Sequence, residues 1–441
     1  MLLLYSLSNF IEVFRIMEKM RIGIMSQGIV PAIYGGAVES LVTLLIEENE
    51  NYKLCDFVLF CLYDKKAKFI SKQYKNTKFM YIHQNVFYRI FYRLKRVVLK
   101  RLNPSGTYLK DDFSCKVKNI IKKNYIFKDN RFDCFIVQEG EHVNGLKDFV
   151  DLFGDRVVYH SHLHEVPVYG SIWPNVISIS EFCRREWLSV PSDTKNVFVL
   201  RNGIDLGKFS KRISDEERLS LREKLGIAED DIVVIYVGRI IPVKGVKELL
   251  LAIDLLQNKS IKLILAGSSS FAKGKMTPYL KEVRSLIDKV KNQVIHVGYI
   301  DNNELYKYYQ AADMQVVPSM WEEAAGLVAI EGMASGLPLV VTRSGGMVEY
   351  VDEKCALVVD KEKDVEINIS EAIQALADDA DLRKRMGKHG MERAKLFSKE
   401  NFYMNFVDII RNIVHFGGAD RNFVYWQWKT AFTSDDFEVA A

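Results

Sequence analysis

Ile232-Val-Val-Ile-Tyr-Val237 decides the fold, because it restarts a pattern already present near the beginning of the chain. This apolar run is typical of a buried strand. It is followed by a glycine-containing loop over 238–245 and by helical spacing over 246–257. The same order of strand, glycine loop and helix runs from Arg21 to Glu47. Two such openings in one chain predict two Rossmann-like, doubly wound α/β domains.

Further short apolar runs alternate with helical or irregular segments in both halves of the chain. They lie at 57–62, 79–82, 134–137, 157–160 and 176–180, and then at 262–266, 294–297, 314–317 and 337–341. This alternation predicts a parallel sheet with helices on both faces in each domain. We expect an extension over 1–20, the two domains over 21–205 and 206–400, and a C-terminal helix and tail over 401–441 that pack back on the first domain.

Composition and charge limit the class of protein. Of the 441 residues, 48% are hydrophobic and 27% are charged, as in soluble globular proteins. The six cysteines form no C-x-x-C pair, which argues against a disulfide framework and a zinc site and favours a reducing compartment. No apolar run approaches the ~20 residues that span a bilayer. We therefore expect a cytoplasmic protein.

The clearest sign of a ligand site lies in the second half of the chain. The motif Pro318-Ser-Met-Trp-Glu-Glu-Ala-Ala-Gly-Leu-Val-Ala-Ile-Glu-Gly-Met-Ala-Ser-Gly-Leu-Pro338 predicts a loop followed by a helix over about 326–335. The first amides of a helix lack internal partners and lie at the positive end of its dipole. The N–H groups of Gly326, Leu327 and Val328 are therefore expected to bind a phosphate.

Charged side chains surround this expected phosphate site. Glu323 lies in the loop before the helix, and Glu331 lies more than one turn inside it. A carboxylate can accept hydrogen bonds from two vicinal hydroxyls, so the pair suits a ribose at one end of the ligand and a sugar at the other. Arg239 and Lys244, in the loop after the 232–237 strand, would neutralise a diphosphate and stabilise it as a leaving group.

Gly298 and Tyr299 follow the strand expected at 294–297, where they offer backbone and ring contacts to a nucleobase. Taken singly, these features have ordinary explanations. A lone helix glutamate is commonly solvent-exposed, two loop cations are commonly solvated, and a glycine such as Gly326 serves packing. Their occurrence together, at corresponding places in one domain, favours a nucleotide-sugar site.

The chain resembles the GT-B glycosyltransferases of family 4 in four stretches. These are the 318–338 motif, Val237-Gly-Arg-Ile-Ile-Pro-Val-Lys-Gly245, Ile177-Ser-Ile-Ser-Glu-Phe182 and Leu200-Arg-Asn-Gly-Ile-Asp205. The resemblance covers roughly residues 21–415. It implies a retaining transfer from a nucleotide sugar, in which the leaving diphosphate assists the incoming hydroxyl, with no bound metal or other cofactor. The second domain would bind the donor, and the first would bind the acceptor.

The same resemblance implies roles for single residues. Glu323 would contact the sugar hydroxyls and Glu331 the ribose. Arg239 and Lys244 would bind the diphosphate. Gly36, in the first strand-to-helix loop, would lie near the diphosphate and the acceptor, although an ordinary tight turn explains it equally well.

Histidines mark the acceptor side. Val157-Val-Tyr-His-Ser-His-Leu-His164 ends an expected strand, and alternation places His160 and His162 on one face. By the resemblance, His162 matches the family's catalytic histidine best, with His160 and His164 as alternatives. A strand-end histidine also serves commonly as a structural residue.

A basic stretch suggests a further partner. Residues 88–128 hold twelve Lys or Arg and two Asp, a formal charge of +10 in a chain whose net charge is +4. Arg89, Arg93, Arg96 and Lys100 step at helical spacing opposite an apolar, partly aromatic stripe. This pattern predicts a helix lying on an anionic membrane surface. The alternative is an ordinary surface helix, whereas nucleic acid is disfavoured because no binding module accompanies the charge.

These observations lead to one function and two alternatives. We expect a hexosyltransferase that uses a UDP-sugar rather than a GDP-sugar and extends a cell-surface or exopolysaccharide glycan. The acceptor would be a free or lipid-linked glycan, and the enzyme would sit peripherally at the inner face of the cell membrane. The alternatives are a non-catalytic GT-B partner subunit and a GT-B enzyme of different chemistry, such as a sugar-nucleotide epimerase or a phosphorylase.

The membrane prediction can be tested by removing the cationic face. Replacement of Arg89, Arg93, Arg96 and Lys100 by Ser should release the protein from anionic liposomes, because each cation near the surface contributes about 1 kcal/mol of attraction. Cosedimentation with vesicles that contain anionic lipid measures the effect. Binding that is unchanged in the variant would support the surface-helix alternative.

Overall fold

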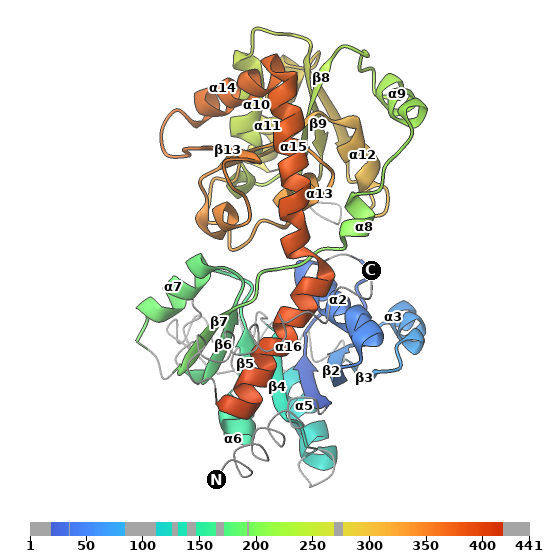
Figure 1. The fold of residues 1–441 in the computed structure, drawn as a ribbon, viewed down its shortest axis with the longest axis vertical. Coiled ribbons are helices and arrows are strands. Elements are labelled where there is room, and N and C mark those ends of the chain that lie inside the picture. The colour runs from blue at the N-terminus through green and yellow to red at the C-terminus, as the bar shows by residue number, and fades with distance from the viewer. Residues whose placement is uncertain are drawn as a thin grey trace, which may run out of the picture.

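The protein, in a computed structural model, is described over residues 19–34, 36–83, 112–125, 131–138, 147–164, 172–191, 194–268 and 277–417. These residues form two α/β domains, one above the other in Figure 1, each with a parallel sheet. The predicted fold class is confirmed. The four basic residues expected to face a membrane, Arg89, Arg93, Arg96 and Lys100, lie outside the described residues.

The first domain is built on a parallel sheet with the strand order β3-β2-β1-β4-β5-β6-β7. The strands are β1 (Met20–Met25), β2 (Cys55–Leu62), β3 (Thr77–Ile82), β4 (Cys134–Gln138), β5 (Val157–His160), β6 (Asn175–Ser178) and β7 (Asn196–Val199). The helices described in this domain are α2 (Ala37–Tyr52), α3 (Lys65–Ile70), α5 (Asp112–Asn124), α6 (Lys147–Phe153) and α7 (Glu181–Ser189). The sequence pattern does not predict β7, a short strand at the edge of the sheet.

Two apolar layers bury this sheet from both sides, as its continuous apolar strands require. Phe57 and Leu59 of β2 point into the layer that contains α2. Val58 and Phe60, the alternate positions of the same strand, point into the layer formed by α5 and α6. Alternate side chains of one strand therefore pack into two different apolar layers, one on each face of the sheet.

The second domain repeats the plan with the strand order β10-β9-β8-β11-β12-β13. The strands are β8 (Ile232–Val237), β9 (Ile261–Ala266), β10 (Val294–Gly298), β11 (Met314–Val317), β12 (Leu339–Thr342) and β13 (Ala356–Val359). The helices are α8 (Leu206–Phe209), α9 (Asp215–Lys224), α10 (Val246–Leu255), α11 (Pro278–Lys289), α12 (Leu305–Ala311), α13 (Leu327–Ala334), α14 (Val365–Asp378) and α15 (Ala380–Ala394). As with β7, the pattern does not predict the short edge strand β13.

In both sheets the strand order reverses at one point, between β1 and β4 and between β8 and β11. The loops that follow such a strand pair leave the carboxyl edge of the sheet in opposite directions, which opens a crevice for ligands. In the second domain these two loops hold the motifs around Lys244 and Glu323. The topology therefore brings together two motifs that are far apart in the sequence.

The chain passes between the domains twice, and the two passages pair with each other. The N–H group of Ile204 donates to the carbonyl of Phe397 at 2.9 Å, and Ile204 forms a parallel bridge with Ser398. After this bridge α16 (Lys399–Phe416, red in Figure 1) returns to the first domain and packs against α2. Tyr403 and Phe406 of α16 are fully buried in the core of the first domain.

Among the described residues, there is no helix with both the length and the apolar character needed to cross a bilayer.

The packing of α16 predicts a stability effect in the first domain. Phe406→Ala should lower the free energy of unfolding by about 3–5 kcal/mol, because it leaves a cavity beside Phe57, whose ring centroid lies 6.2 Å away. Urea unfolding followed by circular dichroism measures the loss. Asn405→Ala, at an exposed position on the same helix, is the control and should change the free energy by less than about 0.5 kcal/mol. Equal stability of the two variants would contradict the packing.

Candidate functional site

The loop after β8 and the loop after β11 are held together by their backbones. The N–H group of Met320 donates to the carbonyl of Val243 at 3.0 Å. Gly245 has a φ of +68°, and a Cβ at this position would lie 1.7 Å from the carbonyl oxygen of Pro318. Glycine is therefore required at residue 245, since any side chain would force the two loops apart.

This backbone contact aligns the predicted cation with the predicted carboxylate. Lys244 Nζ lies 2.5 Å from Glu323 Oε1, and the two side chains are 24% and 13% exposed. The hydroxyl of Ser319 donates to the same carboxylate oxygen at 2.6 Å. The pair is largely shielded from water, so removing either partner would leave a poorly solvated charge. A ligand that enters here must interact with both charges.

Glu323 lies four residues before Leu327, the first residue of α13, and Gly326 is the residue before the first helical turn. No side chain caps this end. Its first N–H groups, including those of Leu327 and Val328, have no partner within the helix and lie at the positive end of the helix dipole. The predicted helix start is thus placed beside the Lys244–Glu323 pair, and this end can accept an anion.

Glu331 lies on the same helix but in different surroundings. Its carboxylate accepts a hydrogen bond from the hydroxyl of Tyr309 at 2.9 Å. Burial raises the pKa of Glu331 to about 7, an effect that this hydrogen bond and the positive charge of Lys208 only partly oppose. Glu331 therefore changes its charge near neutral pH.

A cavity of about 190 Å³ lies between the two domains, at the carboxyl ends of β8, β9 and β10. Of the predicted residues, Gly36, Arg239 and Tyr299 line it. The other lining residues are Val237, Gly238, Ala266, Gly267, Ser268, Ile300, Asn302 and Leu305. Among the described residues, Arg239 has no ion-pair partner for its exposed side chain. The exposed Arg239 and the ring of Tyr299 suit this cavity to a planar group that lies beside an anion.

Gly298 is the last residue of β10. Its carbonyl accepts a hydrogen bond from the N–H group of Gly267 at 2.7 Å. This hydrogen bond joins the ends of β9 and β10, and the next residue, Tyr299, lines the cavity. Tyr299 is 58% exposed, so its ring is accessible for stacking.

The three histidines after β5 separate into two groups. The rings of His160 and His162 lie 4.2 Å apart, as the alternation predicts, and His162 Nε2 lies 2.8 Å from the Gln138 side-chain oxygen. Burial lowers the pKa of His162 to about 3, so its imidazole is neutral at physiological pH. His164 contacts the second domain instead, with its ring 4.9 Å from that of Trp321.

Several residues that support this region cannot be predicted from the local sequence pattern. Ser319 and Tyr309 support Glu323 and Glu331, and Gln138 orients His162. Such partners come from separate elements, so no local spacing identifies them. Within the described residues, no three His, Cys, Asp or Glu side chains gather in a way that would hold a metal ion.

Residues 217–393 match the family model described as Glycosyl transferases group 1. The matched segment covers most of the second domain. It contains Arg239, Lys244, Glu323 and Glu331, together with the amino end of α13, whereas the histidines after β5 lie outside it.

Curated relatives match less than the whole chain. An uncharacterized glycosyltransferase from Methanocaldococcus jannaschii is 34% identical over 180 residues, which are 40% of this chain and 44% of that protein. A lipopolysaccharide 1,2-N-acetylglucosaminetransferase from Salmonella typhimurium is 34% identical over 35% of this chain and 40% of its own length. Spore coat protein SA from Bacillus subtilis is 28% identical over 47% and 55%. The chain thus spans about half the length of these relatives, or less.

Solved structures match both domains. HepE from Anabaena, in complex with UDP, has a TM-score of 0.66 and 17% identity, and the match covers 89% of this chain and 99% of HepE. A glycosyltransferase from Rickettsia africae has a TM-score of 0.69 and 16% identity, over 90% and 99%. At these identities the likeness shows the fold alone, and that fold is GT-B, as predicted.

The raised pKa of Glu331 predicts a pH-dependent stability of the second domain. The folded-state pKa of about 7 lies above the ordinary value of 4.5, so folding favours the protonated carboxyl. This contribution is fully present below about pH 4.5 and is lost as the pH rises through about 7. Glu331→Gln, which stays neutral, should therefore exceed the wild type by less than about 1 kcal/mol at pH 5 and by on the order of 3 kcal/mol at pH 8.

Urea unfolding of both proteins at pH 5, 6.5 and 8 measures this difference. The comparison between variants cancels the titration of all other groups. A constant difference across the three pH values would contradict the assignment of the shift to Glu331.

Proposed function

We propose that the protein is a retaining glycosyltransferase of family 4 that transfers a hexose from a nucleotide diphosphate sugar to a hydroxyl of a growing glycan. The observation that carries this proposal is the Lys244–Glu323 ion pair at the uncapped amino end of α13. Such an arrangement brings together a phosphate site, a cation for the leaving group and a carboxylate that can accept hydrogen bonds from sugar hydroxyls.

The donor would lie along the carboxyl edge of the second sheet. Its diphosphate would bind the N–H groups of Gly326, Leu327 and Val328, with Arg239 approaching from the side of the cavity. Glu323 would accept hydrogen bonds from the sugar. Glu331 would accept them from the ribose, while the base would occupy the cavity beside Tyr299. Bound UDP in HepE, which shares the fold, supports a uridine nucleotide as the donor.

Transfer would proceed without a bound metal or other cofactor. The cation of Lys244 would stabilise the negative charge that develops on the leaving diphosphate. A phosphate oxygen of the leaving group would take the proton of the incoming hydroxyl, and that hydroxyl would bond to the anomeric carbon on the same face. Neutral His162 would contribute a hydrogen bond to the reacting sugar, because a ring with a pKa of about 3 supplies no positive charge at neutral pH.

The acceptor would be a cell-surface or exopolysaccharide glycan, free or linked to lipid. The relative from Salmonella typhimurium, a lipopolysaccharide 1,2-N-acetylglucosaminetransferase, supports this class. The basic stretch at 88–128 would hold the enzyme peripherally on the anionic inner face of the cell membrane. The enzyme would thus work in the cytoplasm, where nucleotide sugars are made.

The decisive test is a panel of UDP- and GDP-sugars with wild type, Glu323→Ala and, as a surface control, Glu353→Ala at an exposed position. Wild type should bind a UDP-sugar and hydrolyse it slowly without acceptor. Glu323→Ala should lose at least about 100-fold in turnover, because it removes contacts that strengthen in the transition state, while a cooperative unfolding transition shows that the fold survives. Near wild-type turnover in this variant would overturn the assignment of the site.

Other outcomes separate the alternatives. Saturable binding without turnover on any acceptor would favour a non-catalytic partner subunit. Conversion of the sugar nucleotide without acceptor, into an isomer rather than a free sugar, would favour an epimerase. NMR of the anomeric proton in the product decides whether the configuration is retained.

A further inference from the structure

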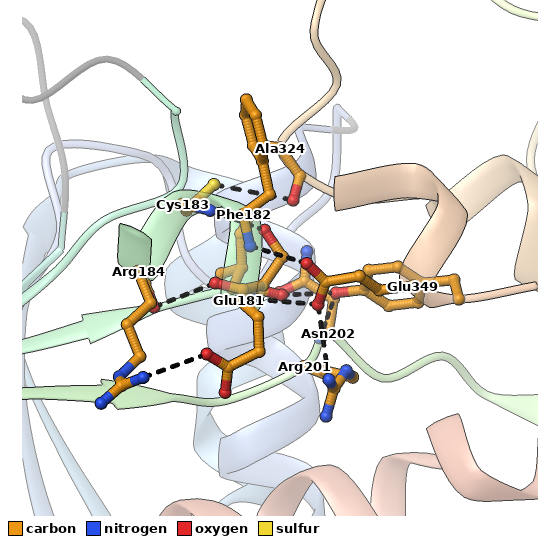
Figure 2. Close-up of polar contacts among 12 residues, drawn as sticks. Glu181, Phe182, Cys183, Arg184, Arg201, Asn202, Ala324 and Glu349 are labelled. Atoms are coloured by element: carbon orange, nitrogen blue, oxygen red, sulfur yellow. Dashed lines mark hydrogen bonds and ion pairs between the residues drawn. The ribbon is translucent and has the colours of Figure 1, made fainter. Parts of the chain in front are cut away.

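The second domain caps a helix of the first domain. Figure 2 shows the carboxylate of Glu349 facing the amino end of α7, where it accepts hydrogen bonds from two consecutive N–H groups. The distances are 2.8 Å from Glu181 N and 2.6 Å from Phe182 N. A carboxylate is favoured here by the unpaired N–H groups and by the helix dipole. The usual cap residue, Ser180, binds only the N–H group of Cys183.

The next residue reinforces this contact. The hydroxyl of Tyr350 donates to the carbonyl of Ile179 at 2.8 Å and accepts from the N–H group of Asn202 at 3.1 Å. Tyr350 is fully buried, so both hydrogen bonds are shielded from water. Two consecutive side chains of the second domain therefore hold the start of α7 and the passage that leaves the first sheet.

The same segment, residues 344–350, contacts the candidate site on its other side. We call it the 344–350 connector. Ser344 Oγ accepts from the N–H group of Glu323 at 3.1 Å, and the N–H group of Gly346 donates to the carbonyl of Glu323 at 2.6 Å. Gly345 has a φ of +43°, and a Cβ there would lie 2.5 Å from the same carbonyl oxygen. The connector thus fixes the backbone of Glu323 on both sides.

A third contact crosses the domains directly beside these. The thiol of Cys183, on α7, lies 3.7 Å from the carbonyl of Ala324, and the two residues share a small apolar cluster with Ile179. The amino end of α7, the connector and the loop that holds Glu323 therefore form one continuous set of contacts (Figure 2).

We propose that Glu349 is a positioning residue, which holds the Glu323 loop in register with the first domain by capping α7. The proposal rests on the proposed function, because transfer requires that the donor sugar beside Glu323 meet an acceptor carried by the first domain. Binding of the nucleotide would depend on it little, since Arg239, Lys244 and α13 belong to the second domain and the first domain adds only Gly36 to the cavity. Loss of Glu349 should therefore affect turnover and leave donor affinity unchanged.

Three variants test this. Glu349→Ala removes the cap, and Glu349→Gln keeps its shape and one acceptor oxygen but loses the charge. Asp64→Ala is the matched control, because Asp64 accepts from two N–H groups at the start of α3, Lys66 N at 2.8 Å and Ala67 N at 3.0 Å, within one domain. It removes the same kind of interaction without any contact between domains.

We expect kcat to fall about 10–100-fold in Glu349→Ala, as small misplacements of reacting groups do, and less in Glu349→Gln. The affinity for the nucleotide should stay within about twofold, and Asp64→Ala should keep the wild-type kcat. An unchanged kcat in Glu349→Ala would overturn the proposal. So would a matching loss of nucleotide affinity, which would show damage to the donor site itself, or an equal fall of kcat in the control.

Amide hydrogen exchange gives a readout that needs no turnover. Glu349→Ala should speed exchange at Glu181 and Phe182, and also at residues 322–324, in the protein without ligand. Faster exchange confined to α7 would show a helix cap that is not coupled to the site. If wild type neither binds nor turns over a nucleotide sugar, the proposed function fails, while the exchange pattern still decides whether Glu349 couples the two segments.

Discussion

The ion pair between Lys244 and Glu323 is the interaction on which the arrangement of the candidate site depends. Each side chain belongs to a loop that follows one of the two strands, β8 and β11, at which the order of the second sheet reverses. The sheet brings the loops together, and the close approach of Gly245 to Pro318 leaves no room for a different register. The ion pair then adds a directional contact between charges that water reaches only partly. The loop that holds Glu323 leads directly into α13. The positions of Lys244, Glu323 and the amino end of α13 are therefore fixed relative to one another.

The second constraint is the way in which the two domains are joined. The chain crosses between them at Ile204 and at Phe397, and these crossings pair with each other. The helix α16 then completes the core of the first domain, although it follows the second in the sequence. The first domain is therefore discontinuous in the sequence, because its core includes a helix that follows the second domain. The 344–350 connector adds side-chain hydrogen bonds between the domains next to the site, at a place separate from the two passages of the chain.

The charged residues of the site differ in their electrostatic surroundings. Glu323 is paired with a lysine, and Glu331 is paired with a tyrosine hydroxyl in a buried setting that raises its pKa to about 7. The two glutamates of one motif are thus not equivalent, although they are the same residue type eight positions apart. His162 is neutral for the same reason that Glu331 is easily protonated, because burial disfavours the charged form of each.

Most of the fold could be predicted from the sequence, because apolar runs and glycine-containing loops indicate local structure directly. The strands missed were β7 and β13, where only four residues at a sheet edge carry the pattern. The site was accessible where its residues are close in the sequence, as in the motif from Glu323 to Glu331. It was not accessible where partners come from distant elements, as with Tyr309, Gln138 and Glu349.

The sequence by itself determined the two Rossmann-like units, the helix whose amino end can bind an anion, and the identity of the charged residues around it. These follow from periodicity, turn residues and side-chain chemistry, which act over a few residues. Only the tertiary structure decided that Lys244 pairs with Glu323, that Glu331 is buried enough to change its pKa, and that Glu349 caps a helix of the other domain. Those outcomes depend on which elements pack together, and packing is set by sheet order and interdomain contacts that no local pattern encodes.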